Sequence, residues 1–345
     1  MASSQVKLSP ESVERVRASL IEKILEDRAS SGMSGPNAWD LLLHEGVTWK
    51  SAVHLDPNLL QELQPEFSPS VTREVLLAAA GIKLSRTCLA DDKVATLERI
   101  AARYNFELCV SEERYIHRPD AGKGGSSNQI ACVAEAANNE GLRNVYVASD
   151  GGLAEAGKML EEAGDDEIFG TLLGIPRCCR NAFARNLAGV SAKQTDFVLV
   201  SLENTPGDMP YDSWLNYPAN YFGGGLISFF PCSYRCERAA LVARSTFAAL
   251  NECGDRWARG FPACLRTNIL YTEYDGLHMF AQPLMNGVIR YTQADLRTTM
   301  EGPLTELLRR GTQLRVYGKR HVAVFREGEQ IGELSGPDIG LCCFF

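Results

Sequence analysis

Apolar residues recur every three or four positions in the first quarter of the chain, which is the spacing of a helix with one buried face. The first such segment opens at Ser9, a residue type that caps helices, with a proline next to it. A later segment opens in the same way at Ser68. The pattern predicts a helical N-terminal region over residues 1–88.

From Asp91 onward the pattern changes to alternating helices and strands. Helices are predicted over Asp91–Asn105, Asn128–Gly141 and Gly151–Asp165, and strands over Phe106–Ile116, Asn144–Asp150 and Thr195–Leu202. Such alternation is typical of a parallel or mixed sheet with helices packed on it. We therefore predict an α/β cysteine-motif domain over residues 89–262.

The last part of the chain is rich in runs that alternate apolar and polar residues. These runs cover Arg266–Tyr274, Gln313–Arg320, His321–Gly328 and Gln330–Gly336. The step at Gly318 and Lys319 lies between two of them and indicates a hairpin turn. The predicted class is α/β, with a helical N-terminal appendage, a central mixed sheet with packed helices, and a β-rich C-terminal region over residues 263–345.

Charge and composition narrow the functional classes. The formal net charge is −8 and the pI about 5.3, which argues against nucleic acid as a partner. No apolar run is long enough to cross a membrane, and the first residues contain no secretory leader. We expect a cytoplasmic protein with no membrane partner. Its eleven cysteines then need a reason other than disulfides.

The stretch FFPCSYRCER places Cys232 and Cys236 ahead of a helix-forming segment. With that helix starting after Pro231, the two cysteines stand at positions i and i+4 on one face near its N-terminus. A helix N-terminus stabilises thiolates, and Arg235 adds positive charge nearby. A role in core packing alone does not explain this pairing.

The stretch LLGIPRCCRNAF repeats the arrangement with two adjacent cysteines, Cys178 and Cys179. They also follow a proline at the start of a helix-like segment, and Arg177 and Arg180 flank them. These two arginines are candidates for stabilising the charge of thiolates or of a cluster. We expect all four cysteines to form one site.

Several groups could occupy such a site. Structural zinc usually binds through C-x-x-C pairs, which these two stretches lack. Adjacent cysteines point apart in regular backbone, which suits the corners of a 4Fe-4S cluster better than one small ion. The pattern favours an iron–sulfur cluster, with zinc as the alternative. Redox thiols without a metal and simple core packing also remain open.

The two stretches resemble an uncharacterised prokaryotic family of unknown function. Its signature is Gly-(Tyr or Ile)-Pro-x-Cys-Cys followed by Pro-Cys-Ser-x-x-Cys, and the resemblance covers roughly Asn144 to Leu250. The family brings no reaction with it. The resemblance implies only that Cys178, Cys179, Cys232 and Cys236 belong to one site.

A third pair, Cys342 and Cys343, stands near the end of the sequence. A mobile terminal dithiol could carry sulfur, electrons or a soft metal to the inner cysteines by thiol exchange, which makes these two cysteines candidate reacting groups. The alternative is that Leu341–Phe345 docks as an apolar plug. The final four residues also satisfy a prenylation pattern, but no basic stretch precedes them.

Other segments carry weaker signals. The glycine-rich loop Arg118–Gln129 and the junction at Asp150–Gly152 could hold a phosphate or another ligand, although both lack a dinucleotide or P-loop spacing. The aromatic loop Tyr211–Cys232 could line a pocket or simply pack on the surface. His117 is the best placed acid–base candidate.

Three functions are compatible with these patterns. The leading one is an iron–sulfur or thiol-centred enzyme that acts on a small molecule by sulfur transfer or redox chemistry. A donor protein would supply the sulfur or the electrons. The second is a non-catalytic metal-binding or metal-delivery protein with Cys342 and Cys343 as a loading arm. The third is an interaction protein whose cysteines only pack.

Overall fold

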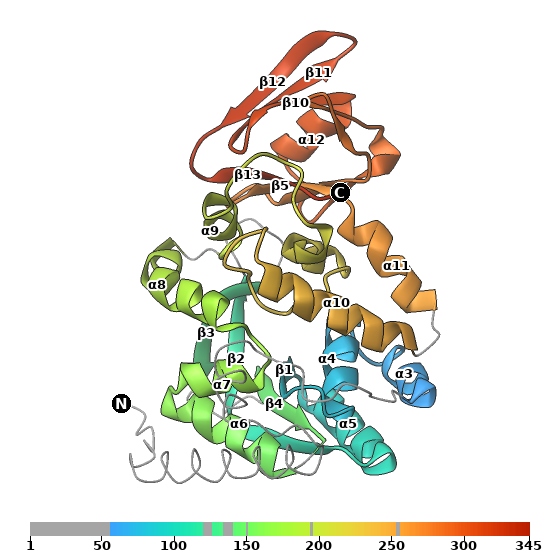
Figure 1. The fold of residues 1–345 in the computed structure, drawn as a ribbon, viewed down its shortest axis with the longest axis vertical. Coiled ribbons are helices and arrows are strands. Elements are labelled where there is room, and N and C mark those ends of the chain that lie inside the picture. The colour runs from blue at the N-terminus through green and yellow to red at the C-terminus, as the bar shows by residue number, and fades with distance from the viewer. Residues whose placement is uncertain (1–55, 120–125, 134–140, 150, 194–195, 253–255) are drawn as a thin grey trace. The chain divides into compact units, whose positions relative to one another are not determined.

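The computed structural model describes residues 56–119, 126–133, 141–149, 151–193, 196–252 and 256–345 (Figure 1). Most of the predicted helical appendage, including the segment at Ser9, lies outside these residues. The chain divides into two compact units. One comprises Met1–Ile116, Ala131–Arg180 and Ala248–Gly254, and the other His117–Ile130, Asn181–Phe247 and Asp255–Phe345. This grouping differs from the three predicted domain ranges, which stay predictions.

The sheet of the first unit has the strand order β1-β4-β2-β3. Its strands are β1 (Ser85–Leu89), β2 (Glu107–Pro119), β3 (Ser126–Val133) and β4 (Leu142–Ala148). β4 pairs antiparallel with β1 and with β2. Five consecutive residues of β4 are buried, so this strand lies at the centre of the unit.

The helices of the first unit are α3 (Pro57–Leu63), α4 (Pro69–Ala79), α5 (Asp91–Tyr104), α6 (Gly151–Ala163) and α7 (Asp166–Leu172). Three of them, α4, α5 and α6, follow the predicted signals. Ser68 caps α4 by accepting a hydrogen bond from the amide of Val71. Tyr146 of β4, Leu160 of α6 and Phe169 of α7 meet in the core of this unit.

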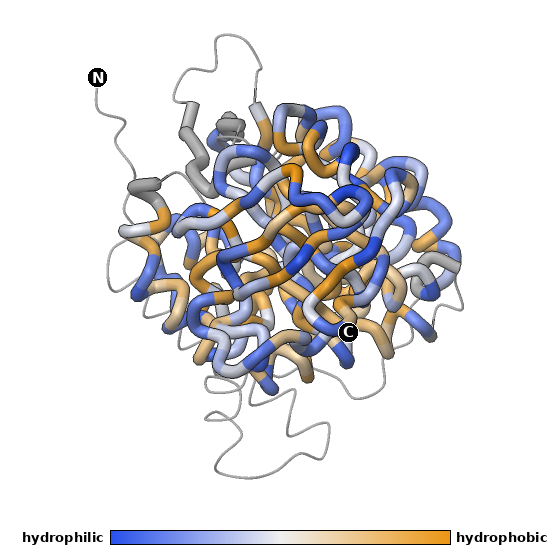
Figure 2. Tube along the Cα trace, turned by 90° about the horizontal axis from the view of Figure 1, so that it is seen from above, coloured by the Kyte–Doolittle hydropathy of each residue, from blue (hydrophilic) through white to orange (hydrophobic). Residues whose placement is uncertain are grey.

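The helical segments that follow are α8 (Arg177–Lys193), α9 (Val198–Glu203), α10 (Glu237–Glu252), α11 (Arg256–Leu265) and the 3-10 turns η2 (Ser213–Leu215) and η3 (Tyr217–Phe222). α8 is one continuous helix, whose first turn belongs to the first unit's range and whose remainder belongs to the second's. No described helix is long and apolar enough to cross a membrane. Figure 2 agrees, because hydrophobic stretches of the described trace are short and interrupted by hydrophilic ones.

The C-terminal part of the second unit contains two sheets, with orders β13-β5-β6-β9 and β12-β11-β10-β8-β7. The elements are β5 (Asn268–Thr272), β6 (Leu277–Phe280), β7 (Leu284–Met285), β8 (Val288–Arg290), η4 (Gln293–Asp295), β9 (Leu296–Thr298), α12 (Pro303–Arg310), β10 (Gln313–Gly318), β11 (His321–Arg326), β12 (Glu329–Ser335) and β13 (Ile339–Cys343). Leu304 and Leu308, one turn apart on α12, join Leu270, Val324 and Leu341 in one core.

These elements confirm the α/β class and its β-rich C-terminal part. The predicted hairpin at Gly318 is also confirmed, because Gly318 faces His321 across the β10–β11 pair. The strand pairs that involve β4 are antiparallel, whereas the alternation had predicted a parallel or mixed sheet.

Two predicted elements are wrong. Residues Thr195–Leu202 were expected as a strand, yet Val198–Glu203 forms helix α9. Asp196, two residues ahead of this helix, accepts a hydrogen bond from the amide of Val198 at 2.9 Å. A short apolar run has no period that separates the two structures. The segment from Asn128, expected as a helix, continues strand β3 to Val133. Residues 134–140 lie outside the described part.

Candidate metal centre

Cys178 and Cys179 lie in the first turn of α8. The chain enters this turn through Gly174, which has a left-handed φ of 74°. The carbonyl of Pro176 then accepts hydrogen bonds from the amides of Cys179, at 2.9 Å, and Arg180, at 3.0 Å. Proline at this place starts the helix, so the motif itself fixes where the two thiols begin.

Cys232 and Cys236 come from the loop that precedes α10. The amide of Cys236 donates to the carbonyl of Ser233 at 3.1 Å, and the carbonyl of Cys236 accepts from the amide of Ala240 at 3.0 Å. Only Cys236 therefore borders the helix, which begins at Glu237. The expectation that both cysteines stack on one helical face is wrong, because a turn at Ser233 separates them.

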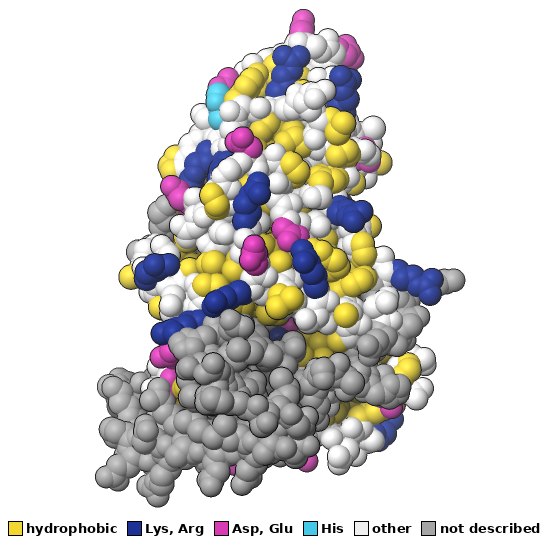
Figure 3. Space-filling view, in the orientation of Figure 1, with side chains coloured by type: hydrophobic (Ala, Val, Ile, Leu, Met, Phe, Trp, Pro, Cys, Tyr) yellow, Lys and Arg dark blue, Asp and Glu magenta, His cyan; other side chains and the backbone are white. Residues whose placement is uncertain are grey.

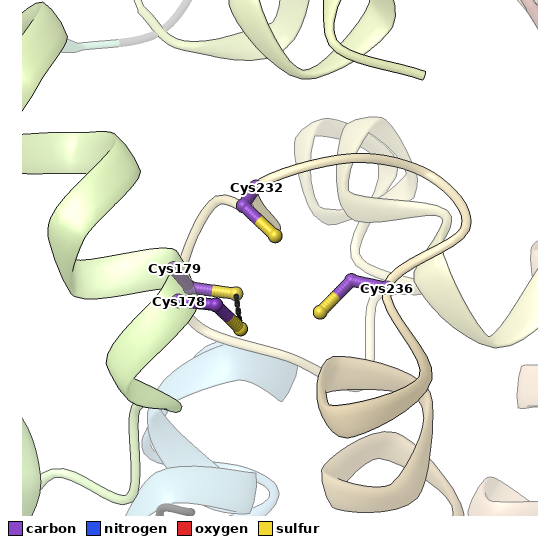
Figure 4. A group of neighbouring side chains, drawn as sticks. All are labelled: Cys178, Cys179, Cys232 and Cys236. Carbon is purple, nitrogen blue, oxygen red and sulfur yellow. Dashed lines mark hydrogen bonds between the residues drawn. The ribbon is translucent and has the colours of Figure 1, made fainter. Parts of the chain in front are cut away.

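The four sulfur atoms nevertheless converge. All four lie within 4.8 Å of one another, and those of Cys178 and Cys179 are 3.9 Å apart (Figure 4). Cys179 and Cys236 are buried, whereas Cys178 and Cys232 are half-buried. None of the described cysteines is joined in a disulfide. The prediction that these two remote motifs share one place is confirmed.

This group of thiols fits a metal ion. Zinc binds thiolate sulfur at about 2.3 Å, so four sulfurs arranged as a tetrahedron around it stand about 3.8 Å apart. The observed upper limit of 4.8 Å needs only small side-chain rotations to reach that value. The expectation that the adjacent cysteines point apart is wrong, because their side chains in the first turn of α8 place the two sulfurs 3.9 Å from each other. The four cysteines can hold a metal ion.

Arg180 lies close to the thiols and is only 8% exposed. Its Nη1 donates to the carbonyl of Ile175 at 2.6 Å. Gly170 makes room for it, because a Cβ at that position would come within 2.5 Å of the arginine Cδ. Burial lowers the pKa of Arg180, and Glu167, Cys178 and Cys179 act in the opposite direction by attracting its charge. A role for Arg180 in stabilising thiolate or cluster charge stays a prediction.

The surroundings of the other two arginines, Arg177 and Arg235, differ from those of Arg180. Arg177 is half-buried at the start of α8, where its charge opposes that of Arg180. Arg235 is exposed and donates to the carbonyl of Asp208 at 2.7 Å, and its guanidinium lies 5.9 Å from the centre of the Tyr211 ring. The expectation that Arg235 supports thiolate charge finds no contact of that kind among the described residues.

Cys342 and Cys343 are part of β13, which pairs with β5. Both are 0% exposed, and the carbonyl of Cys343 accepts from the amide of Tyr211 at 2.8 Å. Burial raises the pKa of Cys342 to about 12, against a hydrogen bond from Tyr234, and also raises the pKa of Cys343. The sequence end is thus docked, and a mobile dithiol arm is not what the structure contains. A reacting role for the pair stays a prediction.

The weaker candidates are placed as follows. Asn216 is buried and donates to the carbonyl of Leu265 at 2.9 Å, while Asn220 donates to the carbonyl of Ile227 at 2.9 Å. These amides hold the aromatic loop together, which favours the packed alternative. Asp150 and much of the glycine-rich loop lie outside the described residues, and so does the side chain of His117.

Sequence reasoning missed the groups that hold the Cys232 loop. Ser201 lies in α9, and Thr205 lies two residues past its end at Glu203. Both form hydrogen bonds with the backbone of this loop. Their spacing of four residues, the spacing of neighbours on one helical face, is the signal that could have revealed them. It was hidden because the segment had been interpreted as a strand.

The chain was compared with known proteins at three levels. No family model, no curated protein and no solved structure matches it. The convergence of the four sulfur atoms is therefore the observation that points to a site.

Proposed function

We propose that Cys178, Cys179, Cys232 and Cys236 hold one zinc ion as four thiolates, and that the chain is a metal-binding protein built around this site. The observation that carries the proposal is the separation of the sulfur atoms, which all lie within 4.8 Å of one another. Four protein thiolates complete the tetrahedral shell of zinc and leave no open position, which is typical of structural sites.

The same distances bear on the iron–sulfur alternative. In a 4Fe-4S cluster each thiolate binds a different iron, so the thiolate sulfurs stand further apart than they do around one ion. The 3.9 Å between the sulfurs of Cys178 and Cys179 supports a shared ion. The N-terminus of α8 and the buried Arg180 would stabilise thiolates in either kind of site, so charge does not separate the two.

One observation favours a second function, an iron–sulfur or thiol-centred enzyme acting on a small molecule. Cys232 is half-buried and lines a small depression whose walls include Phe183, Phe197 and Phe230. A substrate could approach a sulfur from that side, with a donor protein supplying sulfur or electrons. Membership of the prokaryotic family with the same two motifs is part of this proposal too.

Analysis of protein purified without oxygen separates these functions. We expect one zinc per chain, no acid-labile sulfide and a colourless solution. Cys232→Ser should lower zinc content at least tenfold, because it removes a ligand. Cys88→Ser is the matched control and should leave zinc unchanged, since Cys88 donates to the side-chain oxygen of Asn144, accepts from Arg86 and is not one of the four clustered cysteines. Iron with equimolar sulfide would refute the zinc site and support the iron–sulfur form of the second function, and a chain that takes up neither metal would refute both the zinc site and the cluster.

A further inference from the structure

The loop that carries Cys232 is attached on both sides of the cysteine, to helix α9 and to Thr205, which follows that helix. On one side, the hydroxyl of Ser201 donates to the carbonyl of Pro231 at 2.6 Å. On the other, the amide of Tyr234 donates to the hydroxyl of Thr205 at 2.7 Å. Both hydroxyls are buried, at 2% and 1% exposed, so water does not compete for these bonds. The backbone around Cys232 is therefore held by hydrogen bonds at Pro231 on one side and at Tyr234 on the other.

Tyr234, between the two cysteines of the loop, is fixed a second time through its side chain. It is fully buried, and its ring lies edge-on to Phe344, with ring centres 5.1 Å apart. Its hydroxyl lies 3.3 Å from the carbonyl of Val198 and also bonds to Cys342. The loop thus places an aromatic anchor in the core while its cysteines face the other thiols.

Helix α9 is itself held at both ends. At its start, Asp196 accepts hydrogen bonds from the hydroxyl of Tyr271, at 2.7 Å, and from that of Tyr221. After its last turn, Lys319 of the β10–β11 hairpin donates to the carbonyl of Thr205. Because α9 is held at both ends, the hydroxyls of Ser201 and of Thr205, which follows the helix, occupy defined positions. A free loop would not fix them in this way.

We propose that Ser201 and Thr205 are positioning residues of the metal site, which hold the Cys232–Cys236 loop in its binding shape before the ion arrives. This inference rests on the proposed function. Groups that orient metal ligands from behind typically change affinity by about 10- to 100-fold when they are lost. The physical reason is that a preformed loop has little conformational freedom left to lose on binding.

The test measures zinc affinity by competition with a chromophoric chelator, and the cobalt–thiolate charge-transfer spectrum, on the full chain. Thr205→Val and Ser201→Ala should each weaken zinc binding about tenfold or more. Thr205→Ser keeps the hydroxyl and should restore the affinity. The matched control is Thr305→Val, because Thr305 is 1% exposed and donates to the carbonyl of Met300 at 2.7 Å, outside this loop.

The outcomes separate the two proposals. A wild-type chain without zinc or cobalt binding would refute the proposed function and this inference together. If the wild type binds but Thr205→Val and Ser201→Ala bind as tightly as Thr305→Val, the metal site stands and the positioning role is refuted. Ser201→Ala, which removes one hydroxyl and no backbone group, decides the question should Thr205→Val fail to fold.

Discussion

Glu74 of α4 is a carboxylate buried between two cations. It accepts hydrogen bonds from Arg73, at 3.2 Å, and from Lys83. Burial acts to raise the pKa of Glu74, but the charges of Lys83 and Arg73 outweigh it and lower this pKa from 4.5 to about 2. A buried charge that is paired in this way is costly to interrupt, since the partners stay behind without compensation.

Acid should weaken the first unit through this residue. The pKa of Glu74 is lower in the folded state, so its contribution to stability is complete above pH 4.5 and is lost as the pH falls toward 2. We expect Glu74→Gln to lower the free energy of unfolding at pH 7 by on the order of 3 kcal/mol. It should also flatten the pH dependence between 4.5 and 2.

Urea unfolding at several pH values measures both effects. Glu66→Gln is the control, because Glu66 pairs with Lys93 on the surface and such pairs contribute little. Equal slopes for wild type and Glu74→Gln in the acid range would contradict the prediction.

At the scale of elements, what the sequence could predict depends on length and period. The helix from Asp91 repeats its apolar positions over four turns, so α5 was predictable with its end near Asn105. The six residues of α9 are too short to show a period. Its identity depends on burial of its apolar run, and only the folded chain supplies that burial.

The candidate site, like the helices, was predictable from the sequence only in part. Proline ahead of each cysteine pair marked where the thiols stand, and this much could be predicted. The 3.9 Å between Cys178 and Cys179 could not, since it depends on side-chain directions in the first turn of α8. The support from Ser201 and Thr205 links segments about thirty residues apart, which no local pattern reveals.

The burial of Cys342 and Cys343 in strand β13 predicts how these thiols react. Cys342 and Cys343 are 0% exposed and have raised pKa values, so both should stay unlabelled by a maleimide at pH 8 in the folded protein. Both should react once urea unfolds the chain. Peptide mass spectrometry after labelling locates the modified cysteines. Rapid labelling of the pair in native protein would instead support a mobile terminus.

At the scale of the whole molecule, the chain carries a net charge of −8. On the face drawn in Figure 3, basic and acidic side chains of the described residues are interspersed. The described part of this face therefore presents no large field of one sign for steering a charged partner.

Zinc should stabilise the fold as a whole. A ligand that binds only the folded state adds about 4 kcal/mol when its free concentration is a thousand times the dissociation constant. We expect the midpoint of thermal unfolding to fall when zinc is removed with a chelator and to recover when zinc is added back. The midpoint of Cys232→Ser should not respond to zinc. A wild-type midpoint that ignores the chelator would contradict the prediction.

The wide spacing of the two cysteine pairs along the chain gives the proposed ion a topological effect. Joining Cys179 to Cys232 closes a loop that includes α9, η2 and η3. A covalent bridge across about 50 residues would lower the conformational entropy of the unfolded chain and so raise its free energy by about 4 kcal/mol. An ion bound here acts as such a crosslink, but protons and chelators can open it, whereas a disulfide needs a reductant.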